Sequence, residues 1–400
     1  MTNLPDTCDV LIVGGGPAGL AAAARLAEAG LDVHLVEREP VAGGIPRHCG
    51  HSPYGWREFR RVMGGQAYAK RLIARAKACG AQLHTGVTVT DLGRRGQVTV
   101  SSDSGLQSVQ ARAVLLATGA RETPRAPRFI GGTKPGGVMN TGALQSLVYL
   151  NRERPFRRPV VLGSELVSVS AALTCRHAGA QPLAMIEAND RPTTWRAATW
   201  LPRVLGTPLL LSTQIEAIHG RSWVEGVTLV NGQRRWDMDC DGVVVTGAFR
   251  PENALLRASA IDVDPRTRGP VVDQYGRCSD PAYFAAGNLL RPVETAPWCW
   301  NEGRMVAGAI ITALAGGLPD PDLSEPVSAG HSGISWHLPQ RISPNFSSPA
   351  LENVQIGLAR PMTGTVRYGQ ASGNLRSRPA RRILLPLPDG GVDLQFEETP

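Results

Sequence analysis

The first 320 residues alternate short apolar runs with longer amphipathic segments, and the order of these segments repeats. Residues 10–13 are all aliphatic and mostly β-branched, which is typical of a central parallel strand buried on both faces. A glycine-rich turn follows, then an alanine-rich helix predicted over 20–29 and a second strand over 32–36. The same order of strand, turn, helix and strand returns over 159–186. Repeated units of this kind predict an α/β chain with parallel sheets.

Further apolar runs predict a strand over 241–250 and a helix over 305–314. Residues 318–345 are rich in Pro, Ser and Gly, and we expect a linker or covering loop there. Short strands then follow over 354–360, 363–368 and 383–387. They predict a small antiparallel β appendage that covers an edge or contacts a partner.

Composition narrows the class of protein. At about 150 residues per domain, 400 residues predict two or three domains, and 42% hydrophobic residues exclude a disordered chain. The net charge of the chain is +8. Its basic residues are almost all arginines, which are scattered along the sequence with no interleaved aromatic residues. We therefore expect no nucleic-acid partner, whereas an anionic ligand or an acidic partner subunit stays open.

Cysteine usage and the absence of targeting signals set further limits. The seven cysteines form no CxxC pair, so neither a redox pair of that type nor a metal cluster is expected. The N-terminus begins polar and acidic without a basic stretch, and the longest later apolar run, 305–318, is too short to span a bilayer. These features predict a soluble, cytoplasmic protein.

The turn after the first strand carries the chemistry of a dinucleotide site. Gly14 permits a tight turn, Gly16 lets a pyrophosphate approach the backbone, and Gly19 allows close contact between helix and strand. Glu37 ends the second strand 23 residues beyond Gly14, where a carboxylate binds the ribose hydroxyls. We expect this site to be lined by Gly14, Gly16, Pro17, Ala18, Gly19 and Glu37.

Three segments together resemble the flavoprotein disulfide-reductase superfamily, which has two dinucleotide-binding domains. They are residues 9–44, the Ala-Thr-Gly turn that follows strand 114–116, and the string AYFAAGN over 282–288. The resemblance implies FAD as the cofactor. Asn288 stands where these proteins usually carry an aspartate that binds the ribityl chain, and an amide can still donate and accept there. The FAD contacts that the resemblance adds are Arg38, Gly44, Val87, Ala117, Thr118, Gly119, Gly287 and Asn288.

The second strand–turn–helix unit predicts another nucleotide fold, inserted in the first. Gly163 and Glu187 repeat the spacing of Gly14 and Glu37, but Glu165 replaces the middle glycine and would repel a pyrophosphate unless it turns away. Three alternatives stay open here: an NAD(H) site, a site for another adenine nucleotide, or a purely structural fold. The predicted fold class is α/β, with two nested Rossmann-like folds and a small C-terminal β element. The expected boundaries are 1–150 and 249–320 for the FAD domain, 151–248 for the NAD-type domain, and 321–400 for linker and appendage.

The loop that follows the ribose-binding strand is expected to lie near the flavin ring. Arg47, His48 and Cys49 are candidate catalytic residues there, and His51 is a further candidate for handling protons or anions. The alternative is that these are ordinary loop residues, with Cys49 a small buried side chain rather than a nucleophile. Disulfide reductases carry a cysteine pair in this neighbourhood, whereas Cys49 stands alone, so dithiol chemistry is not expected. The resemblance also implies that the helix after the second FAD segment points its N-terminus at the flavin.

The strings GGIPRHCGH, ELVSVSAAL and ETAPWCWNEGR resemble one branch of this superfamily. It comprises FAD-containing subunits, or stand-alone relatives, of hydrogen cyanide synthase, of opine, proline and hydroxyproline dehydrogenases, and of some glycerol-3-phosphate-dehydrogenase-like systems. The resemblance implies an FAD-dependent oxidoreductase that acts with a second flavoprotein subunit on a small amine, amino acid or hydroxy compound. Many members carry a Cys-rich C-terminal segment for an iron–sulfur cluster, and this chain lacks it. The alternatives are a stand-alone NADH-dependent flavoprotein reductase and a non-catalytic nucleotide-binding scaffold.

Overall fold

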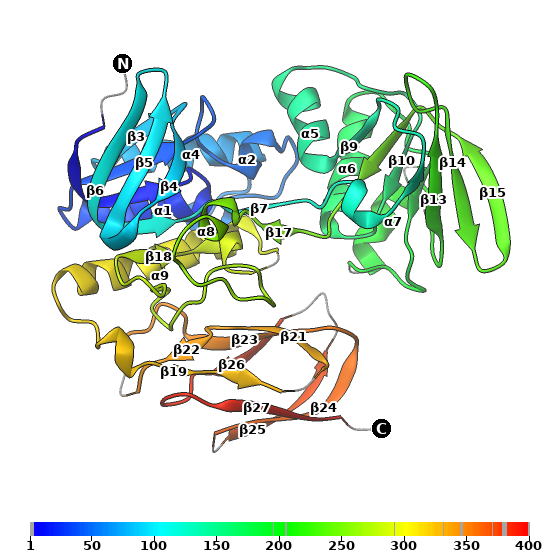
Figure 1. The fold of residues 1–400 in the computed structure, drawn as a ribbon. Helices are drawn as coiled ribbons and strands as arrows, with labels where there is room; N and C mark the ends of the chain where they lie inside the picture. The colour runs from blue at the N-terminus through cyan, green and yellow to red at the C-terminus, as the bar shows by residue number, and fades with distance from the viewer. Residues whose placement is uncertain are drawn as a thin grey trace.

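The computed structural model describes residues 4–194, 196–204, 206–291, 293–330, 332–344, 347–369, 371–377 and 382–398. Figure 1 shows two α/β units side by side and a third, all-β unit that packs beside α9 (Ala296–Leu314). We call the α/β units the first and second nucleotide folds and the all-β unit the appendage (residues 325–398). Within the described ranges, no helix is long and apolar enough to cross a membrane.

The first nucleotide fold is built on a seven-stranded sheet in the order β3-β2-β1-β6-β5-β4, with β18 paired to β6. β18 comes far later in the chain than the other strands but pairs with β6 in parallel, so the second nucleotide fold is inserted between them. The strands are β1 (Thr7–Val13), β2 (Val33–Glu37), β3 (Gln82–Thr85), β4 (Thr88–Leu92), β5 (Gln97–Ser102), β6 (Gly105–Leu116) and β18 (Tyr283–Ala285).

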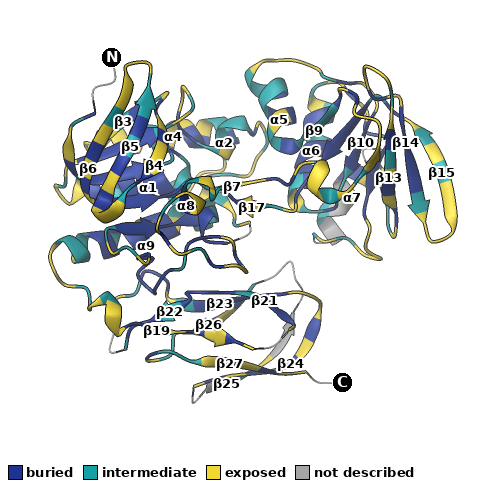
Figure 2. Ribbon diagram, in the orientation of Figure 1, coloured by how far each residue is buried: buried dark blue, intermediate teal, exposed yellow. Residues whose placement is uncertain are grey.

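Both faces of this sheet are covered, as the apolar run in β1 predicts. Val10 and Ile12 pack on one face against helices α1 (Pro17–Glu28), α4 (Gly65–Ala78) and α9. Leu11 and Val13 pack on the other face in a separate core. β1 is buried from Val10 to Val13, whereas β6 is buried only toward its C-terminal end and is largely exposed before it (Figure 2). Short helices complete the fold: α2 (Ile45–His48), α3 (Trp56–Phe59) and α8 (Ala254–Arg257).

Helix α9 begins at Ala296, nine residues before the helix predicted from the apolar run at 305. Pro297 is tolerated because the first turn of a helix needs no backbone N–H from it. The polar Glu302 interrupts the apolar pattern, and for that reason the run alone predicts too late a start. The buried face of the first turns follows the helical period of three and four residues and consists of Cys299, Glu302, Gly303 and Val306.

The second nucleotide fold has a five-stranded parallel sheet in the order β12-β11-β10-β16-β9. Its strands are β9 (Val138–Asn140), β10 (Pro159–Leu162), β11 (Ala184–Ile186), β12 (Leu209–Leu210) and β16 (Gly242–Val245). Its helices are α5 (Thr141–Gln145), α6 (Leu166–His177) and α7 (Arg196–Val204). A second sheet contains β8 (Gly131–Gly132), β13 (Gln214–His219), β14 (Gly226–Asn231) and β15 (Arg234–Asp239).

Two short strands, β7 (Ala120–Arg121) and β17 (Arg250–Pro251), pair antiparallel between the two nucleotide folds (Figure 1). The strand predicted over 241–250 is therefore two strands, β16 and β17, because Gly247 and Ala248 both adopt positive φ and turn the chain between them. Since β8 and β9 pair with strands of the second fold, we propose that this fold begins just after β7.

The appendage has its own core, shared by a four-stranded sheet (β20-β27-β24-β25) and a three-stranded sheet (β21-β23-β26). The linker expected over 318–345 is only partly right, since β19 to β22 lie within it. β19, β20 and β22 have two residues each, which is too few to leave a sequence pattern, and all four strands form through pairing with residues far away in the chain. The strands are β19 (Glu325–Pro326), β20 (Ser328–Ala329), β21 (Ile334–Leu338), β22 (Arg341–Ile342), β23 (Asn353–Leu358), β24 (Met362–Tyr368), β25 (Ala371–Ser377), β26 (Ile383–Pro386) and β27 (Asp393–Glu398).

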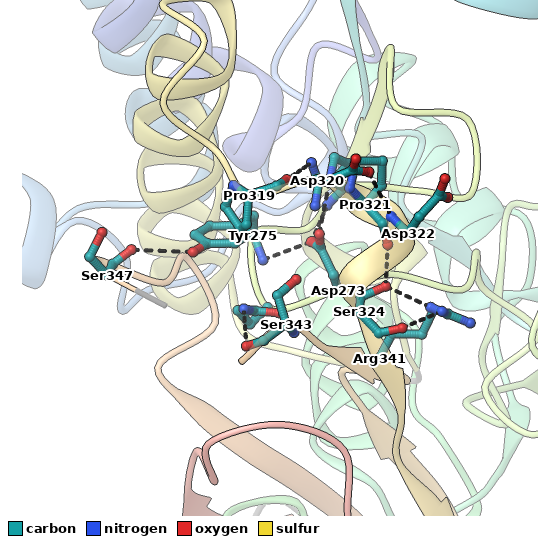
Figure 3. A network of polar contacts seen from close by, with 12 residues as sticks. Asp273, Tyr275, Pro319, Asp320, Pro321, Asp322, Ser324, Arg341, Ser343 and Ser347 are labelled. Atoms are coloured by element: carbon teal, nitrogen blue, oxygen red, sulfur yellow. Dashed lines mark hydrogen bonds and ion pairs between the residues drawn. The ribbon is translucent and has the colours of Figure 1, made fainter. Parts of the chain in front are cut away.

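Buried polar contacts attach the appendage to the first nucleotide fold. The side chain of Gln274 both accepts from the Ser343 backbone N–H, at 3.0 Å, and donates to the Ser343 carbonyl, at 3.2 Å. Tyr275 Oη also donates to the carbonyl of Ser347 (Figure 3). Arg341 Nε donates to Oγ of Ser324, the residue that directly precedes the appendage, at 2.8 Å. Because buried polar groups are costly to leave unpaired, these contacts hold the appendage in one position. The predicted fold class is confirmed in all three parts.

Candidate functional site

The glycine turn after β1 leaves an open cradle at the N-terminus of α1. Gly14 has φ +110, and a Cβ there would lie 2.5 Å from the carbonyl oxygen of Ala117. A Cβ on Gly19 would lie 2.0 Å from the Gly14 carbonyl oxygen, so neither position accepts a side chain. At Gly16, by contrast, no atom lies within 4 Å of where a Cβ would be. Pro17 starts the helix and no side chain caps it, so the first-turn N–H groups of α1, including that of Ala18, are free for an anion.

Glu37 lies at the edge of this cradle and is held in place by two backbone groups. Its Oε2 accepts from the Gly15 N–H at 2.8 Å, and its Oε1 accepts from the Glu39 N–H at 2.9 Å. Each carboxylate oxygen keeps a second lone pair for a ribose hydroxyl. The carbonyl of Glu37 in turn accepts from the N–H of the buried Val87, while Arg38 lies exposed beside it.

Three further segments close around the same turn. The carbonyl of Gly15 accepts from the Gly43 N–H at 2.7 Å, and a Cβ on Gly44 would lie 2.8 Å from the Cα of Gly16. Ala117 pairs with the end of β1 and is followed by Thr118 and by Gly119 at φ +76; Thr118 Oγ1 donates to the Glu252 carbonyl at 2.9 Å. Gly287 contacts α1, since a Cβ there would lie 3.0 Å from the Cβ of Ala18. The structure therefore gathers around one turn the segments expected to bind the first dinucleotide.

Asn288 is engaged within its own loop. Its Oδ1 accepts from the Glu294 N–H at 2.5 Å, and its Nδ2 donates to the Glu294 carbonyl at 3.3 Å. The amide therefore shapes the loop that leads from Gly287 to α9. One lone pair and one N–H remain for the ribityl contact that the sequence predicts.

A buried charged network beneath this loop escaped the sequence analysis. Arg291 is fully buried, and its Nη2 lies 2.9 Å from Glu302 Oε1, while Glu302 Oε2 accepts from the Gly287 N–H at 2.8 Å. Glu294 pairs with both Arg291 and Arg382, and the guanidinium of Arg382 lies over the indole ring of Trp298. Arg382 comes from the appendage, so contacts between residues about 90 positions apart support this loop. No local pattern signals such a network.

The three candidate catalytic residues point in two directions. Arg47 and His48 both approach Glu39, which pairs with Arg47 Nη2 and lies 3.4 Å from His48 Nε2. Burial lowers the pKa of His48. Cys49 turns toward the second nucleotide fold, where its Sγ donates to Gln145 Oε1 at 3.3 Å. The thiol is buried, which raises its pKa, and all seven cysteines are free.

In the second nucleotide fold, Gly163 and Glu187 occupy places equivalent to Gly14 and Glu37. Gly163 follows β10 with φ +121, and its N–H donates to the Ile186 carbonyl at 2.7 Å, as the Gly14 N–H donates to the Val36 carbonyl. Glu187 follows β11 and is buried. Both nucleotide folds therefore carry an acidic residue beside the turn at the carboxyl edge of the sheet.

Two nested nucleotide folds with this arrangement define an oxidoreductase of the FAD- and NAD-binding Rossmann class. The chain belongs to the pyridine nucleotide-disulphide oxidoreductase family, which matches residues 8–303. Members of this family bind FAD and NAD(P). The open cradle at Gly16 and the free N–H groups of α1 fit the pyrophosphate of FAD.

Sequence relatives include components of oxidases with several subunits. The chain is 26% identical to an opine oxidase subunit of Agrobacterium tumefaciens (strain Ach5), an alignment that covers 79% of this chain and 65% of that protein. It is 25% identical to the alpha subunit of sarcosine oxidase from Rhizobium meliloti (strain 1021), covering 93% of this chain and 37% of the relative. The chain thus spans less than two thirds of the length of these relatives.

Solved structures share the fold. The thioredoxin reductase of T. acidophilum superposes with a TM-score of 0.66 at 22% identity, covering 78% of this chain and 100% of that chain. L-proline dehydrogenase from P. horikoshii superposes with a TM-score of 0.61 at 20% identity, covering 79% and 57%. At these identities the likeness concerns the fold alone.

Proposed function

We propose that this chain is the FAD-binding subunit of a hetero-oligomeric dehydrogenase. In this role it acts with a second flavoprotein subunit on a small amine, amino acid or hydroxy compound and passes the electrons on through its flavin. The proposal rests mainly on the open cradle at Gly16, which suits the pyrophosphate of FAD. The names of two relatives, an opine oxidase subunit and the alpha subunit of sarcosine oxidase, support an assembly of several subunits.

Different residues around the cradle bind different parts of FAD. The N-terminus of α1 binds the pyrophosphate, and Glu37 binds the ribose of the adenosine half. The loop from Gly287 to α9 would hold the flavin half, because Gly287 packs directly against Ala18. When bound, FAD supplies the electron transfer itself. The N-terminus of α9 carries a partial positive charge that stabilises negative charge at this end of the site.

The cysteines favour electron transfer through the flavin over dithiol chemistry. Cys49 is the only cysteine in the loop after β2, and it is buried with a raised pKa. A thiol in this state is a poor nucleophile, because the thiolate is the reactive form. It packs as a small residue between the two nucleotide folds.

The test is purification of the full chain with and without its co-expressed neighbouring proteins. We expect the chain to be yellow, to release FAD on denaturation, and to oxidise a small amine, amino acid or hydroxy compound only with its partner. Mass spectrometry identifies the released cofactor, and anaerobic bleaching of the flavin by a substrate panel reports electron flow. A correctly folded chain that stays colourless in excess FAD contradicts the proposal.

A further inference from the structure

The middle positions of the two phosphate turns differ in what occupies them. In the first fold this position is Gly16, which leaves the space beside the turn open. In the second fold it is Glu165, and its side chain turns back over the turn. Its Oε1 accepts from the Ala248 N–H at 3.2 Å, and a Cβ on Gly247 would lie 2.2 Å from the same oxygen. The carboxylate therefore fills the crevice between the turn and the end of β16.

A second carboxylate, on the residue that directly follows β7, enters the same crevice. Glu122 Oε1 accepts from the Gly247 N–H at 3.1 Å. Two successive backbone N–H groups, of Gly247 and Ala248, thus each bind a carboxylate of the chain. Ala248 holds a φ of +47, which is unfavourable for a residue with a side chain. Successive N–H groups in such a turn form a concavity that binds anions, and here internal carboxylates take that place.

The poor solvation of the crevice also disfavours a pyrophosphate. Burial raises the pKa of both Glu122 and Glu165, and each carboxyl lies in a confined, poorly solvated space. Arg128 is the nearby cation, and its Nη2 already donates to the carbonyls of Thr246 and Gly247 at 2.6 Å. An incoming pyrophosphate would have to displace Glu165 from Ala248 and bring further negative charge beside Glu122.

The ribose end of the crevice is occupied as well. Glu187 Oε1 accepts from both the N–H and the Nδ2 of Asn189, at 2.9 and 2.7 Å. Its Oε2 accepts from the hydroxyls of Ser164 and Thr193, and Ser164 Oγ accepts in turn from the Thr193 N–H at 2.9 Å. The segment after β11 therefore folds over the turn. Glu37 differs, because each of its carboxylate oxygens accepts only one hydrogen bond, from a backbone N–H, and so can still accept another from a ribose hydroxyl.

We infer that Glu165 is the selectivity residue that keeps NADH and NADPH out of the second nucleotide fold. Its carboxylate acts as an internal ligand in the place where a dinucleotide pyrophosphate would bind. The inference deepens the proposed function and rests on it in one respect: with NADH excluded, the electrons reach FAD from the partner subunit. The affinity for NADH itself can be measured without that partner.

The test is to titrate the full, FAD-loaded chain with NADH. Calorimetry and the fluorescence of the nicotinamide both measure the binding. Glu165→Gly restores the middle glycine of the motif, and glycine is tolerated at a helix N-cap. We expect this variant to bind NADH at least about tenfold more tightly than the wild type, a difference of about 1.4 kcal/mol. NADPH should gain less, because Glu187 disfavours a 2′-phosphate.

Glu165→Ser serves as a second variant, since serine keeps an N-cap oxygen and removes the carboxylate. Glu216→Gln is the matched control, because it removes an exposed carboxylate of the same fold that pairs with Arg235. Flavin content and melting temperature check that each variant is folded. The inference is overturned if the wild type binds NADH as tightly as the Glu165 variants, or if Glu216→Gln gains as much. Failure of the proposed function would appear separately, as a chain without FAD or without partner-dependent substrate oxidation.

Discussion

Cys49 donates a hydrogen bond from its Sγ to Oε1 of Gln145 at 3.3 Å, across the boundary between the two nucleotide folds. Gln145 also links Cys49 to α6, because its Nε2 donates to Ser170 Oγ in that helix at 2.8 Å. Next to Cys49, the Tyr149 ring packs so closely on Gly50 that a Cβ there would lie 2.1 Å from it. The loop after β2 is therefore anchored to the second fold.

This anchoring predicts an inert thiol. We expect Cys49 to resist alkylation by iodoacetamide in the native protein, since it is buried and its pKa is raised, and to react fully after denaturation. Cys79 lies at the end of α4 and is partly exposed, so it serves as the internal comparison. Cys49→Ser keeps a donor to Gln145 and should change substrate turnover by less than about twofold. Peptide mass spectrometry measures the labelling. Rapid labelling of Cys49 in the native protein would contradict this prediction and favour Cys49 as a nucleophile.

Glu37 offers a direct test of the cradle. We expect Glu37→Arg to lower FAD occupancy by about tenfold or more, because the ribose loses its acceptor and the Gly15 N–H loses its partner. Glu37→Gln keeps one acceptor oxygen and should retain more cofactor. The measurement is the ratio of flavin to protein absorbance after purification and dialysis. An unchanged ratio in Glu37→Arg would show that FAD binds without this carboxylate.

The local parts of the fold were predictable from the sequence, and the long-range parts were not. The turn at Gly14 and the position of Glu37 follow from neighbouring residues, because a parallel strand, its turn and its helix are specified within about thirty residues. The orientation of Glu165 depends on Ala248, which lies 83 residues further on. The sequence indicated that a carboxylate at this position would matter, but it could not indicate that the side chain turns inward.

The loop between Gly287 and α9 gives a second example. Its shape depends on Arg291 and Glu302, and on Arg382 from the appendage. Charged residues usually signal solvent exposure, so a sequence pattern places them on the surface. Here Arg291 and Glu302 are buried because they form an ion pair with each other, and only the three-dimensional structure reveals that pair.

The buried pair of Arg291 and Glu302 predicts a large loss of stability when it is broken. We expect Glu302→Leu to lower the free energy of unfolding by about 3–5 kcal/mol, because the fully buried Arg291 loses its shorter ion pair and keeps only the 3.5 Å pair with Glu294, and the Gly287 N–H loses its acceptor. The exposed pair Arg235–Glu216 is the control, and Glu216→Gln should change stability by at most about 1 kcal/mol. Urea unfolding measures both. Equal effects of the two variants would contradict a structural role for the buried pair.

A histidine pair in the first sheet predicts how stability depends on pH. His34 Nδ1 lies 2.9 Å from His84 Nε2, so one ring donates and the other must accept, and His34 Nε2 lies 3.2 Å from Asp32 Oδ1. Both rings are buried on adjacent strands. Burial, and then the neighbouring His34, lower the pKa of His84 from its ordinary value of 6.5. The folded chain therefore holds His84 neutral at a pH where the unfolded chain already protonates it.

The sign of the effect follows from this difference in proton uptake. As pH falls below about 6.5, the unfolded state binds a proton that the folded state does not, and stability decreases by up to about 1.4 kcal/mol per pH unit until the folded pKa is reached. His84→Gln keeps a donor toward His34 but cannot titrate, so its stability should fall less between about pH 7.5 and pH 5.5. Melting temperatures of both proteins over this range provide the measurement. A variant that loses as much stability as the wild type would show that other groups carry the pH dependence.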